Sequence, residues 1–198
     1  MRTREAIAQA VEFDYRLKKQ SGGAGEFAHV TGHIEPCDRP FVFENRVVGG
    51  AIPKAFIPAC EKGCEDALTT GPVEGYPVMG IKVILEGGSY HAVDSSEYAF
   101  RTAAQLAVKQ AISQAKPYLL EPIMRVEVET PQEFVGRVQG DLSARRGLLL
   151  GSQTQFGDLI IQAEVPLVQM FGYSNSLRSL TSGMATFTME FACYRPVQ

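Results

Sequence analysis

Hydrophobic and polar positions repeat with two different periods along this chain, and these periods predict its elements. In the first half, short apolar or alternating runs are typical of β-strands and cover residues 4–19, 26–35, 41–48 and 77–86. A helical period separates the last two runs, beginning at Pro53 and ending near Leu68. The first half therefore combines strands with at least one helix.

The longest helical pattern follows the last of these strands. Apolar and small side chains share one face of residues 95–116, and Pro117 ends the pattern. Asp94 and Glu97 have the spacing of a capping box, in which each side chain bonds a free backbone N–H of the first turn. We therefore expect Asp94 to cap this helix.

The second half has a different order of elements. Its periods predict, in turn, strand, helix, strand, strand, helix and strand, over residues 121–129, 130–146, 147–156, 158–166, 166–181 and 185–194. This order is that of a ferredoxin-like domain. The sequence thus predicts an α+β protein with domains at 1–119 and 120–198.

Composition limits the class of protein. The chain has 198 residues, 45% hydrophobic side chains and a formal net charge of −3, which is enough apolar material for packed cores. Its apolar runs are shorter than a membrane span, and Met1–Glu5 does not resemble a signal peptide. We expect a cytoplasmic protein without membrane contact.

The four cysteines suggest packing more than metal binding. Cys60 and Cys64 lie one helical turn apart in an apolar stripe, where free cysteine acts as a small hydrophobe. A zinc site could draw on Cys37, Cys60, Cys64, His29 and His33, but the spacing of a zinc knuckle is missing. We expect no metal site.

Catalytic motifs are weak. Gly23–Ala28 matches a dinucleotide-binding string but leads into a strand instead of the helix that such a site requires. Ser89, His91 and Asp94 offer the side chains of a hydrolase triad, but residues this close in sequence seldom converge in that geometry. A hydrolase stays a minor alternative, and we expect no catalytic residue.

Two glycine-containing loops remain as candidate binding elements. Residues 87–91 precede the N-terminus of the long helix, where outward N–H groups favour anions. Arg16, Lys18 and Lys19 lead into the other loop. Residues 1–119 carry 13 Lys and Arg against 14 Asp and Glu, so an RNA-contacting loop and a solvated surface both stay open.

A series of motifs, in order, resembles the C-terminal third of bacterial translation elongation factor G, that is, its fourth and fifth domains. The motifs cover nearly the whole chain. They are Lys19–Gly23, His29–Val30, Gly49–Pro53, Ile57–Ala59, Gly71–Pro72, Gly75–Val78, Gly88–His91, Val93–Glu97, Leu120–Met124, Val126–Val128, Gly140–Ser143, Arg145–Gly147, Glu164–Leu167, Met170–Tyr173 and Leu177–Thr181.

This resemblance implies a fold and a function. Residues 1–119 would be similar to the second domain of ribosomal protein S5, with a left-handed βαβ crossover, and residues 120–198 would be ferredoxin-like. Family members promote tRNA–mRNA translocation after GTP hydrolysis in a separate G domain. GTP and Mg²⁺ would bind there, so we expect this chain to be no GTPase and to hold no cofactor.

The resemblance also implies partners and contact residues. In the family, the fourth domain enters the decoding site of the small ribosomal subunit, and the fifth domain contacts large-subunit rRNA and the stalk base. We expect a monomer. The implied contacts are tip loop I (Gln20, Ser21, Gly22, Gly23, Ala24, Gly25, Glu26), tip loop II (Gly87, Gly88, Ser89, Tyr90, His91) and the fifth-domain arginines Arg145, Arg146 and Arg178. The expected helix cap, Asp94 with Glu97, would position tip loop II.

Tip loop I departs from the family pattern. Ala24 stands where many members have a basic or polar residue, and Glu26 adds a negative charge. This difference leaves two alternatives open beside a translocation factor: a paralogue specialised in ribosome recycling, and a standalone module that binds the ribosome or a protein. The chain begins at the fourth-domain boundary, so we expect an expressed fragment.

Overall fold

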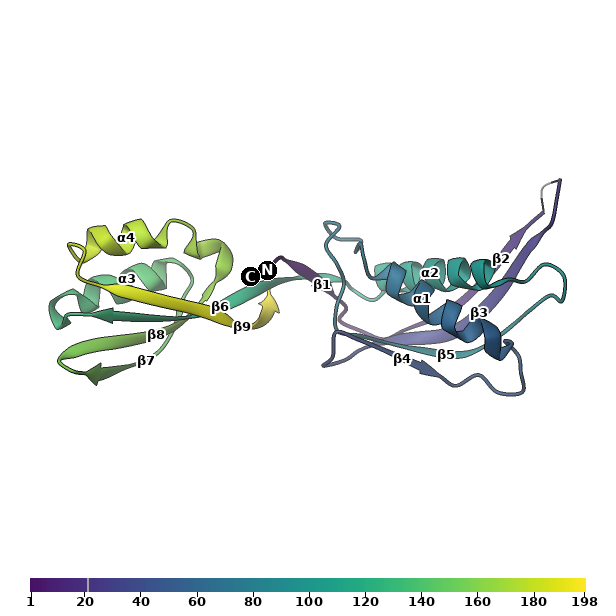
Figure 1. The fold of residues 1–198 in the computed structure, drawn as a ribbon, viewed down its shortest axis with the longest axis horizontal. Coiled ribbons are helices and arrows are strands. Elements are labelled where there is room, and N and C mark those ends of the chain that lie inside the picture. The colour runs from purple at the N-terminus through teal and green to yellow at the C-terminus, as the bar shows by residue number, and fades with distance from the viewer. Residues whose placement is uncertain (21) are drawn as a thin grey trace. The chain divides into compact units, whose positions relative to one another are not determined.

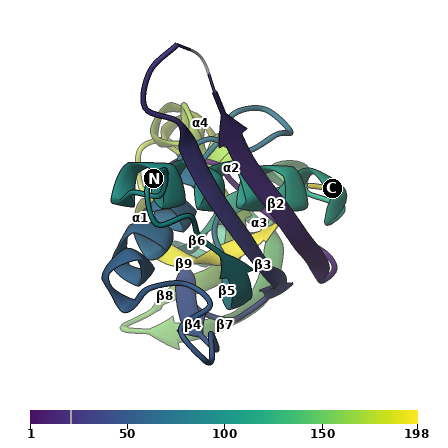
Figure 2. The same ribbon diagram turned by 90° about the vertical axis from the view of Figure 1, so that its right-hand side faces the viewer.

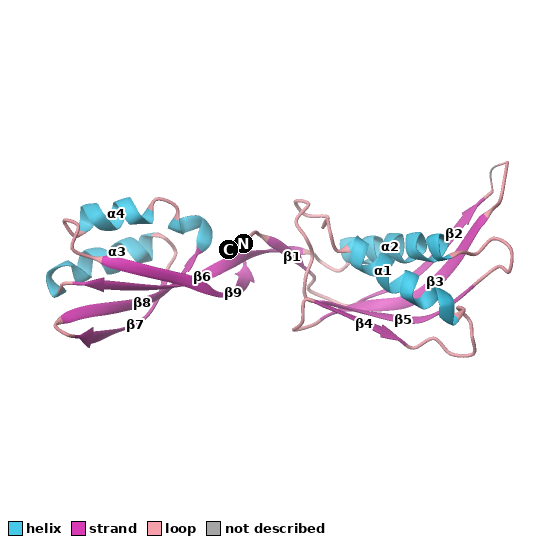
Figure 3. Cartoon of the chain, in the orientation of Figure 1, coloured by secondary structure: helices cyan, strands magenta, loops and turns pink. Residues whose placement is uncertain are grey.

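A computed structural model describes residues 1–20 and 22–198. The chain divides into two compact units. The first unit is Thr3–Leu119, and the second is Leu120–Gln198 with Met1–Arg2. In each unit, helices cover one face of a sheet (Figures 1 and 3), which gives the predicted α+β fold. In the part of the chain described, no helix combines the length and the apolar character that a membrane crossing needs.

The first unit contains a sheet with strand order β2-β3-β5-β4. Neighbouring strands are antiparallel except β4 and β5, which are parallel and are joined through α1, as the implied βαβ unit requires. The run predicted at 4–19 is two strands. The elements are β1 (Arg4–Ala6), β2 (Val11–Lys19), β3 (Glu26–Pro36), β4 (Phe41–Asn45), a 3-10 turn (Lys54–Phe56), α1 (Ile57–Ala67), β5 (Ile81–Ser89) and α2 (Glu97–Gln114).

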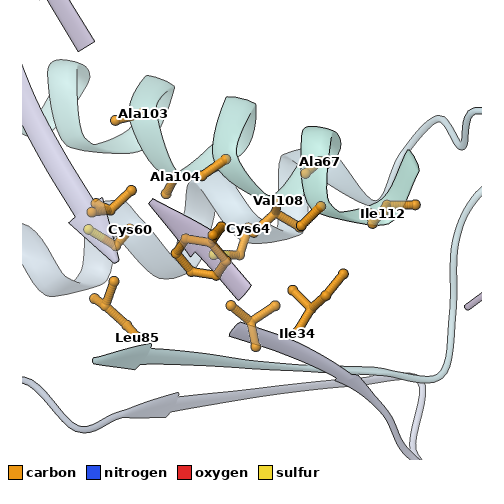
Figure 4. Close-up of a cluster of buried hydrophobic side chains, with 14 of the residues drawn as sticks. Ile34, Cys60, Cys64, Ala67, Leu85, Ala103, Ala104, Val108 and Ile112 are labelled. Carbon is orange, nitrogen blue, oxygen red and sulfur yellow. The ribbon is translucent and has the colours of Figure 1, made fainter. Parts of the chain in front are cut away.

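Small side chains let α1 and α2 pack closely over this sheet. A Cβ atom at Gly63 of α1 would lie 2.1 Å from the Arg101 carbonyl oxygen of α2, so only glycine fits there. Cys60 and Cys64 of α1 lie in the same apolar cluster (Figure 4), which confirms them as core residues. Burial raises the pKa of the Cys60 thiol to about 12 and raises that of Cys64 as well.

The second unit is a ferredoxin-like βαββαβ domain, as predicted. Its strand order is β9-β6-β8-β7, and each neighbouring pair is antiparallel. The elements are β6 (Tyr118–Thr130), a 3-10 turn (Gln132–Phe134), α3 (Val135–Ala144), β7 (Leu148–Gln155), β8 (Asp158–Pro166), a second 3-10 turn (Leu167–Met170), α4 (Tyr173–Leu180) and β9 (Thr186–Pro196).

The helix predicted at 166–181 is wrong in its first half. A 3-10 turn ends at Met170, and α4 begins only at Tyr173. Between them Gly172 adopts a φ of 75°, a left-handed conformation that ends one helical segment before the next begins. The interior glycine therefore separates two short helices.

A buried carboxylate organises the loop between α1 and β5. Glu5 is fully buried and accepts hydrogen bonds from the backbone N–H groups of Val73, Glu74 and Tyr76 at 3.0, 2.8 and 3.1 Å. A Cβ atom at Gly71 would lie 2.0 Å from Glu5 Oε2, so glycine leaves room for the carboxylate. Three N–H donors thus stabilise one buried charge.

Replacing Glu5 with Gln should loosen this loop, because an amide nitrogen cannot accept a hydrogen bond. We expect the unfolding free energy to fall by about 1–3 kcal/mol and the amides of Val73, Glu74 and Tyr76 to exchange faster with deuterium. Urea denaturation and NMR hydrogen exchange measure the two effects. The exposed Glu61→Gln is the matched control, and an equal effect of both variants would contradict this role of Glu5.

Burial also predicts which thiols react. Cys37 and Cys193 are partly exposed, whereas Cys60 and Cys64 are buried with raised pKa values. Iodoacetamide at pH 8 should therefore alkylate Cys37 and Cys193 in the native protein, and all four cysteines only in denaturant. Peptide mass spectrometry distinguishes these sites; rapid native labelling of Cys64 would mean that the helix pair opens.

Candidate functional site

Loop I joins β2 to β3, and loop II, residues 90–96, joins β5 to α2. Figure 2 shows the β2–β3 hairpin that carries loop I projecting past the helices. Of the residues predicted for loop I, Gln20, Gly22, Gly23, Ala24 and Gly25 lie in the connection, Glu26 is the first residue of β3, and Ser21 is outside the described residues.

The second predicted loop is partly strand. Gly87, Gly88 and Ser89 extend β5, where they pair with Thr31, Val30 and His29 of β3. Tyr90 and His91 alone leave the strand and enter loop II. The apolar pattern ended at Leu85, so it did not reveal that backbone pairing continues through the glycines. The sheet therefore carries loop II almost to its tip.

Backbone and hydroxyl contacts attach loop II to the start of β3. The Phe27 N–H donates to the Asp94 carbonyl oxygen at 2.9 Å. The Ser95 hydroxyl donates to the Phe27 carbonyl oxygen at 2.7 Å and accepts from the His91 N–H at 2.9 Å. Two segments far apart in sequence are therefore joined at one end of the first unit.

A glycine of loop I lies directly against loop II. A Cβ atom at Gly25 would lie 3.1 Å from the Asp94 carboxyl carbon, closer than side chains normally pack. Any larger residue at this position would press on Asp94. The two loops are thus in close approach, as an arrangement of two tip loops requires.

The predicted helix cap is wrong. Ser96 caps α2, since its hydroxyl accepts from the Ala99 N–H at 3.1 Å. The carbonyl of Asp94 is bonded to Phe27, and the helix begins two residues later than the Asp94–Glu97 capping box requires. Glu97 instead occupies the first turn of α2, where a negative charge suits the helix dipole. Asp94 belongs to the contact between the loops.

His91 is presented to solvent on an aromatic support. Its side chain is 63% exposed, and its Nδ1 lies 3.8 Å from Asp94 Oδ2. Its ring lies 5.1 Å from the Phe27 ring, centroid to centroid, with a tilt of 52°. Tyr90 beside it is 48% exposed. Aromatic rings and an imidazole in this position can stack on bases and donate hydrogen bonds to RNA.

The hydrolase combination is not assembled. The Ser89 hydroxyl lies 3.0 Å from Nδ1 of His29 and does not use His91 as its partner. Among residues 1–20 and 22–198, no group of three or more His, Cys, Asp or Glu side chains is arranged to hold a metal ion. What the tip does present is the exposed pair Tyr90 and His91, whose side chains can bind a partner by stacking and hydrogen bonds.

The arginines predicted as RNA contacts of the second unit differ in their surroundings. Arg145 is largely buried: it donates to Asp141 and Ser176 at 2.9 Å each and to the Gln169 carbonyl at 2.5 Å. Its guanidinium also lies 5.0 Å from the centre of the Tyr173 ring. Arg145 therefore connects α3 to α4 and the turn before it.

Arg146 and its neighbours form an ion-pair network on the sheet. Arg146 binds both carboxylate oxygens of Glu121 at 3.0 Å. Glu164 pairs with Arg195 and with Arg125, and these hydrogen bonds, with Arg195 as the larger cause, lower the pKa of Glu164. These cations are largely neutralised within the unit.

Arg178 is exposed in the last turn of α4. Arg146 is exposed as well, but Glu121 holds its guanidinium. Sequence reasoning missed Phe27, Ser95 and Ser96, which hold and start the loop II region. The adjacent serines before a helical pattern were a usable signal for a cap. The contact to Phe27 had no local signal.

Family models match almost the whole chain. "Elongation factor G, domain IV" matches residues 1–116, and "Elongation factor G C-terminus" matches residues 118–198. Elongation factor G 1 of Syntrophus aciditrophicus is 51% identical over 98% of this chain and 28% of that relative. Elongation factor G of Rhodopirellula baltica is 53% identical over 97% of this chain and also 28% of the relative.

A solved structure shows the same fold. A crystal structure of a Thermus thermophilus protein superimposes with a TM-score of 0.93 at 44% identity, covering 98% of this chain and 29% of that one. The chain thus spans less than a third of the length of these relatives. It belongs to the elongation factor G family of translation factors, matching domain IV and the C-terminal domain.

Proposed function

We propose that this chain is the ribosome-engaging part of a translational GTPase that promotes tRNA–mRNA translocation. The observation that carries this proposal is the single tip formed by loops I and II, joined through Phe27, Asp94 and Ser95. In the family the corresponding loops are expected in the decoding site, where the small ribosomal subunit holds the codon–anticodon duplex. Here they would occupy that site and prevent the tRNA–mRNA duplex from slipping back.

The mechanism is positional. Tyr90 and His91 are exposed on loop II, while Phe27 and Ser95 fix the loop behind them. The first 119 residues carry no excess of cations, with 13 Lys and Arg against 14 Asp and Glu. Recognition would therefore depend on stacking and shape more than on phosphate neutralisation, and its salt dependence would be shallow.

The second unit would contact large-subunit rRNA and the stalk base. Arg178 is available for this contact as an exposed cation, whereas Arg145 and Arg146 are engaged within the unit. GTP hydrolysis with Mg²⁺ would belong to the G domain of the whole factor, and this chain would supply no catalytic residue. We infer a monomeric, cytoplasmic protein in which both units bind one ribosome.

Replacing His91 with Ala tests the tip. The chain should be placed in a chimera, replacing the corresponding part of elongation factor G 1 of Syntrophus aciditrophicus, to which it is 51% identical. We expect translocation to slow by about three- to tenfold, the effect of losing one or two hydrogen bonds. Urea denaturation should show unchanged stability, since the side chain is 63% exposed.

Single-turnover translocation on pre-translocation ribosomes measures this rate. Glu61→Ala on the exposed side of α1 is the control and should leave the rate unchanged. An unaltered rate for the His91 variant would remove this residue from the mechanism. A chimera that splits ribosomes but does not translocate would favour the recycling alternative.

Replacing Arg178 and replacing Arg145 should have different effects, the first on ribosome binding and the second on stability. Arg178→Ala should weaken ribosome binding by about two- to tenfold without loss of stability, because it removes one exposed cation. Arg145→Ala should instead lower the unfolding free energy by about 2–3 kcal/mol, since it breaks partly buried hydrogen bonds. Ribosome pelleting and urea denaturation measure both; reduced stability of the Arg178 variant would contradict its assignment.

A further inference from the structure

We propose that Asp14, His29 and Ser89 form a hydrogen-bonded chain across three strands that positions loop II, with His29 as the positioning residue. The Nε2 atom of His29 lies 2.7 Å from Asp14 Oδ1, and its Nδ1 atom lies 3.0 Å from Ser89 Oγ. Asp14 comes from β2, His29 from β3 and Ser89 from β5. This inference rests on the proposed function only where it concerns ribosome binding.

The direction of these hydrogen bonds follows from their donors and acceptors. The Asp14 carboxylate can only accept, so the ring donates to it through Nε2–H. In the neutral ring Nδ1 then carries no hydrogen and accepts from the Ser89 hydroxyl. Asp14 therefore selects the tautomer, and the tautomer determines that Ser89 donates.

The position of Ser89 determines the start of loop II. Ser89 is the last residue of β5, opposite His29 in the ladder, and Tyr90 and His91 follow it directly. The backbones are also tightly apposed here: a Cβ atom at Gly88 would lie 1.9 Å from the His29 carbonyl oxygen. A shift of Ser89 would therefore move the exposed aromatic pair.

The same strand supports loop II at a second point. Phe27 and His29 are two residues apart on β3 and thus lie on one face of the sheet. Phe27 contacts the ring of His91, while His29 binds Ser89, two positions before His91. Asp14, Arg16 and Lys18 alternate onto this face of β2, with Arg16 opposite His29 and Lys18 opposite Phe27. Loop II is thus held both at Ser89, directly before it begins, and at the ring of His91.

This arrangement differs from a catalytic serine site. Serine hydrolases present Nε2 to the serine and Nδ1 to a buried aspartate. Here the two ring nitrogens are exchanged, and the Asp14 side chain is 75% exposed. The contacts therefore fit a cross-strand clamp.

NMR of the full 198-residue chain at pH 8 tests the clamp directly. We expect the His29 imidazole to show the Nε2–H tautomer. Ser89→Ala should speed hydrogen exchange of the His91 amide by about fivefold, the effect of losing one hydrogen bond near it. Ser113→Ala, whose hydroxyl bonds to its own helix, is the matched control and should have no effect there.

Two conservative substitutions of His29 distinguish a positioning role of this residue from a role in packing alone. Asn places its amide near the position of Nδ1 and can keep the Ser89 contact, whereas Gln places it near Nε2 and keeps only Asp14. We expect His29→Asn to retain slow exchange at His91 and His29→Gln to resemble Ser89→Ala. An Nδ1–H tautomer, or equal exchange in the Asn and Gln variants, would overturn the proposal.

Ribosome binding distinguishes this inference from the function on which it rests. In the chimera we expect Ser89→Ala and His29→Gln to weaken ribosome binding several-fold and His29→Asn to restore it. If exchange at His91 responds as expected while binding does not change, positioning holds and the role of loop II on the ribosome fails. If exchange does not respond, the clamp itself is refuted.

Discussion

The geometry of the tip depends on the two hydrogen bonds of the Ser95 hydroxyl. This hydroxyl donates to the Phe27 carbonyl and accepts from the His91 N–H, so one side chain joins β3 to the turn of loop II. The neighbouring bond from the Phe27 N–H to the Asp94 carbonyl adds a second attachment. Loop II is thereby held along its length as well as at its ends, and the exposed His91 has a defined position.

Each unit contains charged side chains that are bonded within the unit itself. Glu5 is enclosed by backbone N–H groups, Arg145 by α3 and α4, and Arg146 by Glu121. These contacts stabilise the scaffold. Loop II instead exposes the phenol ring of Tyr90 and the imidazole of His91, which suits recognition by stacking and shape.

The sequence predicted the architecture well because periodicity reports which face of an element is buried. The ferredoxin-like order and the buried Cys60 and Cys64 followed from such periods. It failed where tertiary contacts compete with local signals. Asp94 matched a capping box, but its backbone is bonded to Phe27 and Ser96 became the cap.

The sequence did not predict which side chains meet across strands and helices, for a related reason. Ser89 was paired in sequence with His91, its near neighbour, whereas the fold brings it to His29, 60 positions away. Arg145 and Arg146 both follow a helix and were expected to bind RNA, but local pattern cannot show that Tyr173 and Glu121 meet them. The pairing of strands and helices decides these contacts.

Directed hydroxyl-radical cleavage tests the central claim, that this tip lies against small-subunit RNA. An iron chelate would be tethered to a cysteine at position 91 or, as control, at position 61, in the chimera with Cys37 and Cys193 replaced by serine. We expect cleavage of small-subunit rRNA at the decoding site from position 91 and little from position 61. Equal cleavage from both positions, or none from position 91, would contradict it.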